Sequence, residues 1–107
     1  MRKVIYAQAA SVAAGAIGLA LAPSATAAVW TANQDAVFVT FCEGNGLHDA
    51  DGPAAEAWVG REIADDLVSG VDPNDESYYI YSNTNNTITQ DDADTIVRAA
   101  GVAYLGW

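Results

Sequence analysis

The stretch PAAEAWVGREIADDLVSG, residues 53–70, decides the fold of this chain. Proline is favoured at the first position of a helix, and glycine is favoured at its left-handed end. Between them the apolar residues recur every three or four positions, which places them on one helical stripe: Ala55, Trp58, Val59, Ile63, Ala64, Leu67 and Val68. We therefore predict one helix over this stretch, with polar residues that mostly face water: Glu56, Arg61, Glu62, Asp65 and Asp66.

The segment before this stretch also has a helical pattern. Its apolar residues share one stripe over 33–42: Val37, Phe38, Phe41 and Cys42. Asn33 or Thr31 can cap the start of this helix, and Gly44 or Gly46 can end it. A polar loop, Leu-His-Asp-Ala-Asp-Gly over 47–52, then leads to the central stretch.

Two further helices are predicted after the central stretch. Asp-Pro-Asn-Asp over 72–75 supplies a cap, a first-turn proline and an acidic first turn, so a short helix should run on through Tyr81. A strand is the alternative for Tyr-Tyr-Ile-Tyr, although the chain offers no second strand to pair with it. Thr89 and Asp92 have the spacing of a capping box before the last helix. These patterns predict an all-α fold, a small bundle of three to four short helices.

The first residues of the chain have the three parts of a secretory signal. A basic start precedes an apolar run over 12–21, and Ala25-Thr26-Ala27 supplies the small residues that a signal peptidase accepts. We predict cleavage after Ala27, or else after Ala28, and a retained membrane anchor is the alternative. The chain would then consist of a signal peptide, 1–27, and a single small helical domain, 28–107. This domain would be secreted, either extracellular or associated with the cell wall.

The acidic composition of the domain limits its partners. Two of the four basic residues lie in the signal segment and all 14 acidic residues follow it, so 14 acidic and two basic side chains leave a net charge of −12. Such a field repels nucleic-acid phosphates and anionic lipid headgroups, so neither nucleic acid nor a membrane surface is an expected partner. Cationic ligands, basic proteins and divalent metals remain open, as does a role of the charge in solubility alone.

A set of short motifs spans residues 35–105: Asp35 and Phe38, Gly46-Leu47, Gly60-Arg61-x-Ile63, Asp66-Leu67, Gly70 and Ala103-Tyr104. In this order the motifs resemble the small secreted domain of unknown function 732, which is found in mycobacteria and related actinobacteria. The resemblance implies an exported helical domain, and it implies no enzymatic activity.

The resemblance also implies a cysteine pair that this chain lacks. Family members carry one cysteine after the Gly-Arg-x-Val segment and another after the final Ala-Tyr, and the corresponding residues here are Ala64 and Leu105. A bridge that closes a loop of this length would be worth roughly 4 kcal/mol. Because both replacements are apolar, we predict that Ala64 and Leu105 approach each other in the core.

The residues that could carry chemistry have simpler structural interpretations. Cys42 lies on an apolar stripe, where a buried thiol is inert, so we expect it in the core, with an intermolecular disulfide as the alternative. His48 should be solvated. Asp49 and Asp51 resemble part of a calcium loop and are candidate ligands for a divalent metal, but two main ligands of that loop are missing. A turn ahead of Pro53 is the preferred interpretation.

Aromatic residues are numerous for so small a domain, and three of them are close together: Tyr78, Tyr79 and Tyr81. On a helix, Tyr78 and Tyr81 share a face and Tyr79 points elsewhere, so at least one of the three should be exposed. Aromatic faces serve peptide and glycan binding, which makes this tyrosine group a candidate contact surface.

These observations favour a non-enzymatic binding or interaction module of the cell envelope or extracellular space, with an unknown protein or glycan as partner. The alternative is a carrier of a small ligand or divalent metal that uses the acidic loop or the tyrosine group. No catalytic residue and no cofactor is predicted.

Overall fold

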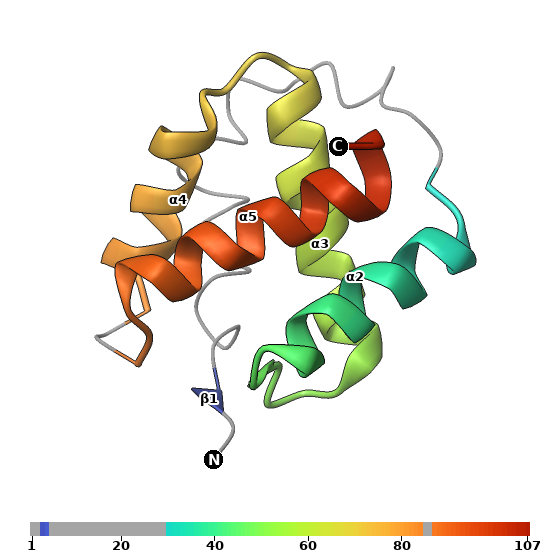
Figure 1. Ribbon diagram of the computed structural model, residues 1–107, viewed down its shortest axis with the longest axis horizontal. Coiled ribbons are helices and arrows are strands. Elements are labelled where there is room, and N and C mark those ends of the chain that lie inside the picture. The colour runs from blue at the N-terminus through green and yellow to red at the C-terminus, as the bar shows by residue number, and fades with distance from the viewer. Residues whose placement is uncertain (1–2, 5–29, 85–86) are drawn as a thin grey trace.

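The computed structural model describes residues 3–4, 30–84 and 87–107, and four helices make up most of this part (Figure 1). They are α2 (Ala32–Gly44), α3 (Pro53–Val68), α4 (Pro73–Ser82) and α5 (Gln90–Leu105). The described residues thus confirm the predicted all-α fold. Apart from Lys3 and Val4, the predicted signal peptide lies outside the described residues. No helix in the described part is both long and apolar enough to cross a membrane.

Local side-chain caps explain where two of the helices begin. Thr31, one of the two predicted caps of α2, accepts from the backbone N–H of Gln34, whose side chain accepts from the Thr31 N–H at 2.7 Å. Thr89 and Asp92 form the same reciprocal pair at the start of α5, as their spacing predicts. Each pair satisfies backbone N–H groups that have no partner within the helix.

The last helix, α5, is the central element of the bundle and packs against each of the other three helices. Figure 1 shows it in front of α3, with α4 on one side and α2 on the other. Its buried face is rich in small residues, which let the neighbouring helices approach closely: Ala93, Ala99, Ala100, Gly101 and Ala103. Larger side chains fill the core around it: Phe38, Leu47, Val59, Ile63, Ile80, Ile88, Ile96, Val97 and Tyr104.

Two sequence-based predictions are wrong in detail. Glu56 and Asp66, which the helical stripe placed toward water, are only 1% and 2% exposed. Residues 47–52, predicted to be a polar loop, begin with a short strand, β2 (Leu47–His48), which pairs in parallel with β1 (Lys3–Val4). Val59, Ile63 and Ala64 of the predicted stripe meet the core, whereas Trp58 and Val68 of the same stripe are 49% and 57% exposed. Other segments of the fold cover Glu56 and Asp66. Both corrections follow from such contacts between segments that are distant in sequence.

Candidate functional site

The acidic loop after β2 forms a turn. Asp49 is 5% exposed, its Oδ1 accepts the Asp51 N–H at 2.7 Å, and its own N–H donates to Glu56 Oε1 at 3.3 Å. Burial raises the pKa of Asp49, and the hydrogen bond from Asp51 opposes this shift. These bonds build a turn ahead of Pro53. Within residues 3–4, 30–84 and 87–107, no group of three or more His, Cys, Asp and Glu residues is arranged to hold a metal ion.

The tyrosine group is divided between surface and core. Tyr78 is 62% exposed and Tyr79 is 38% exposed, whereas Tyr81 packs against the hydrophobic core. The expectation that at least one tyrosine is exposed is therefore confirmed. Tyr78 and Tyr81, which were expected to share a face, differ in burial: Tyr78 is exposed and Tyr81 packs against the core. Cys42 is fully buried in the core, as expected. His48 is half-buried, and its Nδ1 is buried without a hydrogen-bond partner, so the prediction of a solvated imidazole is wrong.

A polar network joins three helices through Asp35 of α2. Arg61 of α3 donates to both carboxylate oxygens, from Nε to Oδ1 at 2.8 Å and from Nη2 to Oδ2 at 2.7 Å. The hydroxyl of Tyr104 on α5 also donates to Oδ1, at 2.7 Å. The hydrogen bonds from Arg61, and after them the one from Tyr104, lower the pKa of Asp35 although burial opposes them. Burial and the bond to Asp35 raise the pKa of Tyr104, so its hydroxyl stays a donor.

The residues of this network are those that the family resemblance singled out, and their arrangement gives them a structural role. Phe38, one turn after Asp35, lies directly on Gly60, where a Cβ atom would come within 2.7 Å of the ring. Trp30 packs edge-on against Tyr104 and donates from Nε1 to Asp65 at 2.9 Å. Since the Asp35 carboxylate is occupied by Arg61 and Tyr104, the network serves to hold α2, α3 and α5 together.

A shallow apolar groove of about 420 Å³ lies between α2 and the start of α3. Small residues line most of it, together with Asp35 and Thr40: Ala32, Ala36, Val39, Pro53, Ala54 and Ala57. Its one charged lining group, Asp35, is committed to the network. The groove therefore offers little chemistry of its own.

The most distinctive surface feature lies between α4, α5 and the residue that follows α5. Gly106 ends α5 with a φ of 73°, a backbone conformation that favours glycine, and so turns the chain back. The N–H of Trp107 then donates to the carbonyl of Gly101 at 3.2 Å. The indole lies on Gly101, where even an alanine Cβ would come within 2.0 Å of it. Two glycines thus hold an aromatic ring that is 55% exposed.

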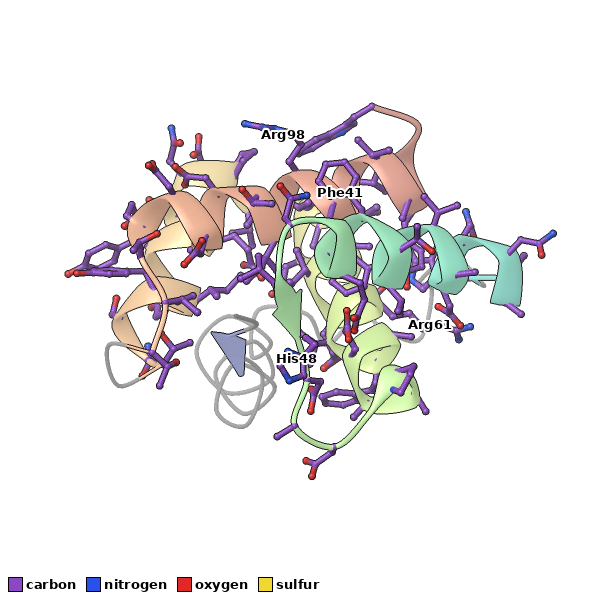
Figure 2. The ribbon with its side chains drawn as sticks, turned by 60° about the horizontal axis from the view of Figure 1, so that its bottom comes forward. Phe41, His48, Arg61 and Arg98 are labelled. Carbon is purple, nitrogen blue, oxygen red and sulfur yellow. The ribbon has the colours of Figure 1, made fainter. Side chains whose placement is uncertain are left out.

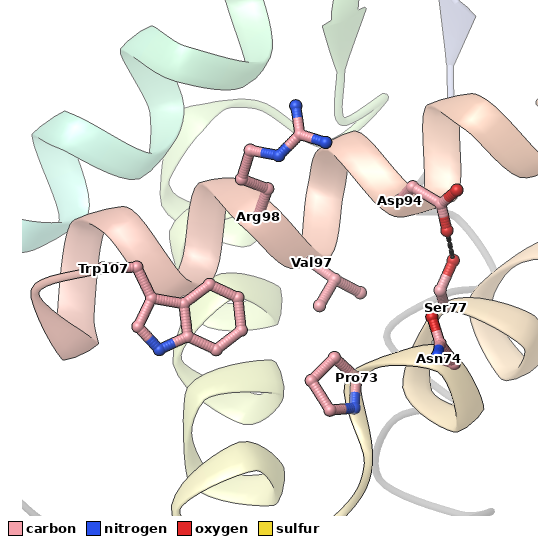
Figure 3. Close-up of a pocket in the computed structure, with 7 residues that line it drawn as sticks. All are labelled: Pro73, Asn74, Ser77, Asp94, Val97, Arg98 and Trp107. Atoms are coloured by element: carbon pink, nitrogen blue, oxygen red, sulfur yellow. Dashed lines mark hydrogen bonds between the residues drawn. The ribbon is translucent and has the colours of Figure 1, made fainter.

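This ring borders a cleft of about 300 Å³, shown in Figure 3. We call it the Trp107 cleft, and seven residues line it: Pro73, Asn74, Ser77, Asp94, Val97, Arg98 and Trp107. The Trp107 indole lies at one end of the cleft in this view, and at the other end Ser77 donates a hydrogen bond to Asp94. A cleft with an aromatic face at one end and a carboxylate, an amide and a hydroxyl at the other can bind a ligand that has an apolar part and a polar part.

Arginine is scarce around these features. Figure 2 shows the side chains of Arg61, below α2, and Arg98, on α5. Arg61 is paired with Asp35, whereas Arg98 is exposed and projects upward from the edge of the Trp107 cleft in Figure 3. The Asp94 carboxylate therefore remains the charged group next to the hydroxyl of Ser77.

A pair of buried carboxyl groups belongs to α3 and α4. Glu76 of α4 is 0% exposed and Asp66 of α3 is 2% exposed. Neither oxygen of Glu76, nor Oδ2 of Asp66, receives a hydrogen bond from an N–H or hydroxyl donor. The two carboxyl groups instead interact with each other, since each contributes to the pKa shift of the other, and a hydrogen bond between two carboxyl groups exists only when one of them carries a proton.

Ala64 and Leu105 both belong to the packed interior. Ala64 is fully buried in the core cluster, and Leu105 packs against that cluster from the end of α5. Trp30 contacts the neighbours of both residues, Asp65 and Tyr104, which brings this turn of α3 near the end of α5. A direct contact between Ala64 and Leu105 remains a prediction.

Comparison with protein-family models, with curated proteins and with solved structures found no match for this chain.

Sequence reasoning did not find the Trp107 cleft or the buried carboxyl pair. A signal for the cleft was present, because Gly106-Trp107 follows a helix that carries Gly101 on an otherwise alanine-rich face. No local signal distinguished Glu76 from Asp75 beside it, although Asp75 is exposed. Their difference in exposure arises from the packing of α4 against α3 and α5.

Proposed function

We propose that this chain is a non-enzymatic binding module that is exported from the cell and binds a basic polypeptide segment in the Trp107 cleft. The observation that carries the proposal is the exposed Trp107 indole, which two glycines hold at one end of a cleft whose other end contains the carboxylate of Asp94. A lysine or arginine side chain can lay its apolar stem and cationic head on an indole face. The negative charge of Asp94, at the other end of the cleft, would add a longer-range attraction for such a cation.

The charge of the chain supports a cationic partner. After the predicted signal segment, 14 acidic residues stand against Arg61 and Arg98 alone. Arg61 is already paired with Asp35. A surface of this kind attracts basic segments over a distance of about 10 Å at moderate salt, and raises their rate of association.

A glycan is the second candidate partner, and the polar lining of the cleft favours it. Asn74 and Ser77 place an amide and a hydroxyl at the end of the cleft opposite the indole, and these groups can exchange hydrogen bonds with sugar hydroxyls. Glycan binding would depend little on ionic strength, whereas binding of a basic peptide would weaken as salt is added. Salt dependence therefore distinguishes the two partners.

The proposal is tested by titrating the full chain with a short lysine- and arginine-rich peptide and following intrinsic tryptophan fluorescence. Binding should weaken by about tenfold or more in Trp107→Ala, because a desolvated cation–π contact and its apolar packing are lost. Gly101→Ala should have a similar effect, since its Cβ would displace the indole. Asp94→Asn should weaken binding about threefold to tenfold and reduce its salt dependence.

Trp58→Ala is the matched control. Trp58 is 49% exposed, close to the 55% of Trp107, but does not line the cleft, so its replacement should leave the affinity unchanged. Equal losses in the Trp58 and Trp107 variants would exclude the cleft as the binding site. Binding of a chitin-type or other cell-wall oligosaccharide, with no response to the basic peptide, would favour the glycan instead.

The proposal of export is based on the three-part signal pattern of residues 1–27, and the family resemblance is a further argument for it. We expect a host that secretes proteins through signal peptidase to release a chain that begins at Ala28. Intact mass spectrometry of the culture fluid checks this, and Ala27→Leu should block the cleavage because the peptidase needs a small residue there. Recovery of the uncleaved chain in the membrane fraction would support a retained anchor.

A further inference from the structure

The helix α4 is fastened to its neighbours by three buried residues: Glu76, Ser77 and Ile80. Ile80 enters the hydrophobic core, and Ser77 donates to Asp94 of α5. Glu76 instead meets Asp66 of α3. The attachment of α4 to α3 therefore includes two buried acids.

The surroundings of these two acids are acidic as well. On α3, Glu62 and Asp65 are the charged groups that act on the pair. On α5, the charged group is Asp94, which accepts a hydrogen bond from Ser77, the residue after Glu76. On α4 itself, Asp72 and Asp75 are exposed. Arg61 is paired with Asp35, so the buried acids have no described cation to neutralise them.

Two ionised carboxylates at hydrogen-bonding distance cannot both be stable in a buried site, because each is desolvated and repels the other. One proton resolves the conflict. The protonated group donates to the ionised one, and such charge-assisted bonds are shorter and stronger than neutral ones. The proton thus acts as the bonding element between α3 and α4.

We propose that Asp66 and Glu76 form a proton latch, which fastens α4 to α3 while the pair holds a proton and releases α4 when both carboxyl groups ionise. The latch itself is independent of any ligand. Pro73, Asn74 and Ser77 of the same helix line the Trp107 cleft, so release of α4 would also alter that cleft. This last consequence rests on the proposed function, whereas the latch does not.

The direction of the pH response follows from the shifts. Burial, and then the neighbouring carboxyl, raises the pKa of Glu76, and burial also raises the pKa of Asp66. A raised folded-state pKa contributes stability that is complete below the ordinary pKa of a carboxyl group and is lost as the pH rises through the raised value. The latch should therefore be closed in acidic solution and should open toward alkaline pH.

Amide hydrogen exchange of the full chain tests the latch. Protection factors, corrected for the intrinsic effect of pH, should fall about tenfold or more in α4 between about pH 5.5 and 8.5. They should fall less in α2. In Glu76→Gln the α4 protection should change less than about threefold, because glutamine keeps the size and still donates to Asp66 without titrating. Asp75→Asn removes one exposed charge from the adjacent position and should behave as the unmodified chain.

An equal fall in Glu76→Gln and the unmodified chain would overturn the latch, as would a pH-independent α4 in the unmodified chain. A carbon-13 titration of the unmodified chain decides the matter even if the variant does not fold. The signal of the Glu76 side-chain carboxyl carbon should change at a pH far above the titration midpoints of exposed acids. A midpoint in the ordinary range of a glutamate would contradict the proposal. The hydrogen-exchange and carbon-13 measurements do not depend on whether the Trp107 variant binds peptide. Either proposal can therefore fail while the other holds.

Discussion

Replacing Phe38 by alanine should lower the free energy of unfolding by about 3–5 kcal/mol. The Phe38 side chain is completely buried, and its ring centre lies 6.0 Å from that of Tyr104 on α5. It also lies on Gly60 of α3. One side chain of α2 therefore fills the space among three helices, and its truncation leaves a cavity that their rigid backbones cannot close. Urea unfolding followed by circular dichroism measures the change.

Val37→Ala is the matched control for this prediction. Val37 is adjacent on the same helix but 45% exposed, so its truncation should cost less than about 0.5 kcal/mol. Similar losses from the two truncations would show that Phe38 does not join the helices as described.

The contact between Phe38 and Gly60 can be isolated with a double-mutant cycle. Gly60→Ala alone should destabilise the chain by about 1–3 kcal/mol, because its Cβ would lie 2.7 Å from the Phe38 ring. In the Phe38→Ala background the same change should cost much less, because the ring is gone. Additive costs would contradict a direct contact.

The helices could be predicted because their signals are local. The capping box at Thr89 lies within four residues of sequence, and the apolar stripe of α3 lies within one helix. Thr31 could be identified as a possible cap for the same reason. Such signals depend on backbone geometry that the chain adopts regardless of its neighbours.

The site could not be predicted because its parts are distant in sequence. The helical stripe placed Asp66 toward water, and the spacing of α4 did not distinguish Glu76 from any other acid of the first turn. Each acid is buried in the folded chain, although the pattern of its own helix does not require it. The Asp35 carboxylate likewise acquires its role from Arg61 and Tyr104, which lie 26 and 69 residues away. Periodicity within a single segment carries no information about such contacts.

A disulfide engineered between positions 64 and 105 should stabilise the fold by about 4 kcal/mol relative to the reduced form of the same variant. The variant is Ala64→Cys with Leu105→Cys, which restores the cysteine pair that the family resemblance implies. Trp30 already contacts the neighbours of both positions, Asp65 and Tyr104. Oxidation closes a loop of roughly 40 residues and so restricts the unfolded chain much more than the folded one.

The measurement is the midpoint of urea unfolding with and without a reductant, together with mass mapping of the bridge. Comparing two redox forms of one variant removes the cost of the Leu105 truncation from the result. Leu105→Cys alone is the control: its sole possible internal partner, Cys42, is fully buried, so no internal bridge should form. An exclusively intermolecular bridge in the double variant would mean that the two positions do not meet, and the alignment with the family would then fail. An internal bridge with the expected stabilisation would show that positions 64 and 105 meet in the fold, as the family resemblance implies, and that apolar side chains pack there in the absence of a covalent link.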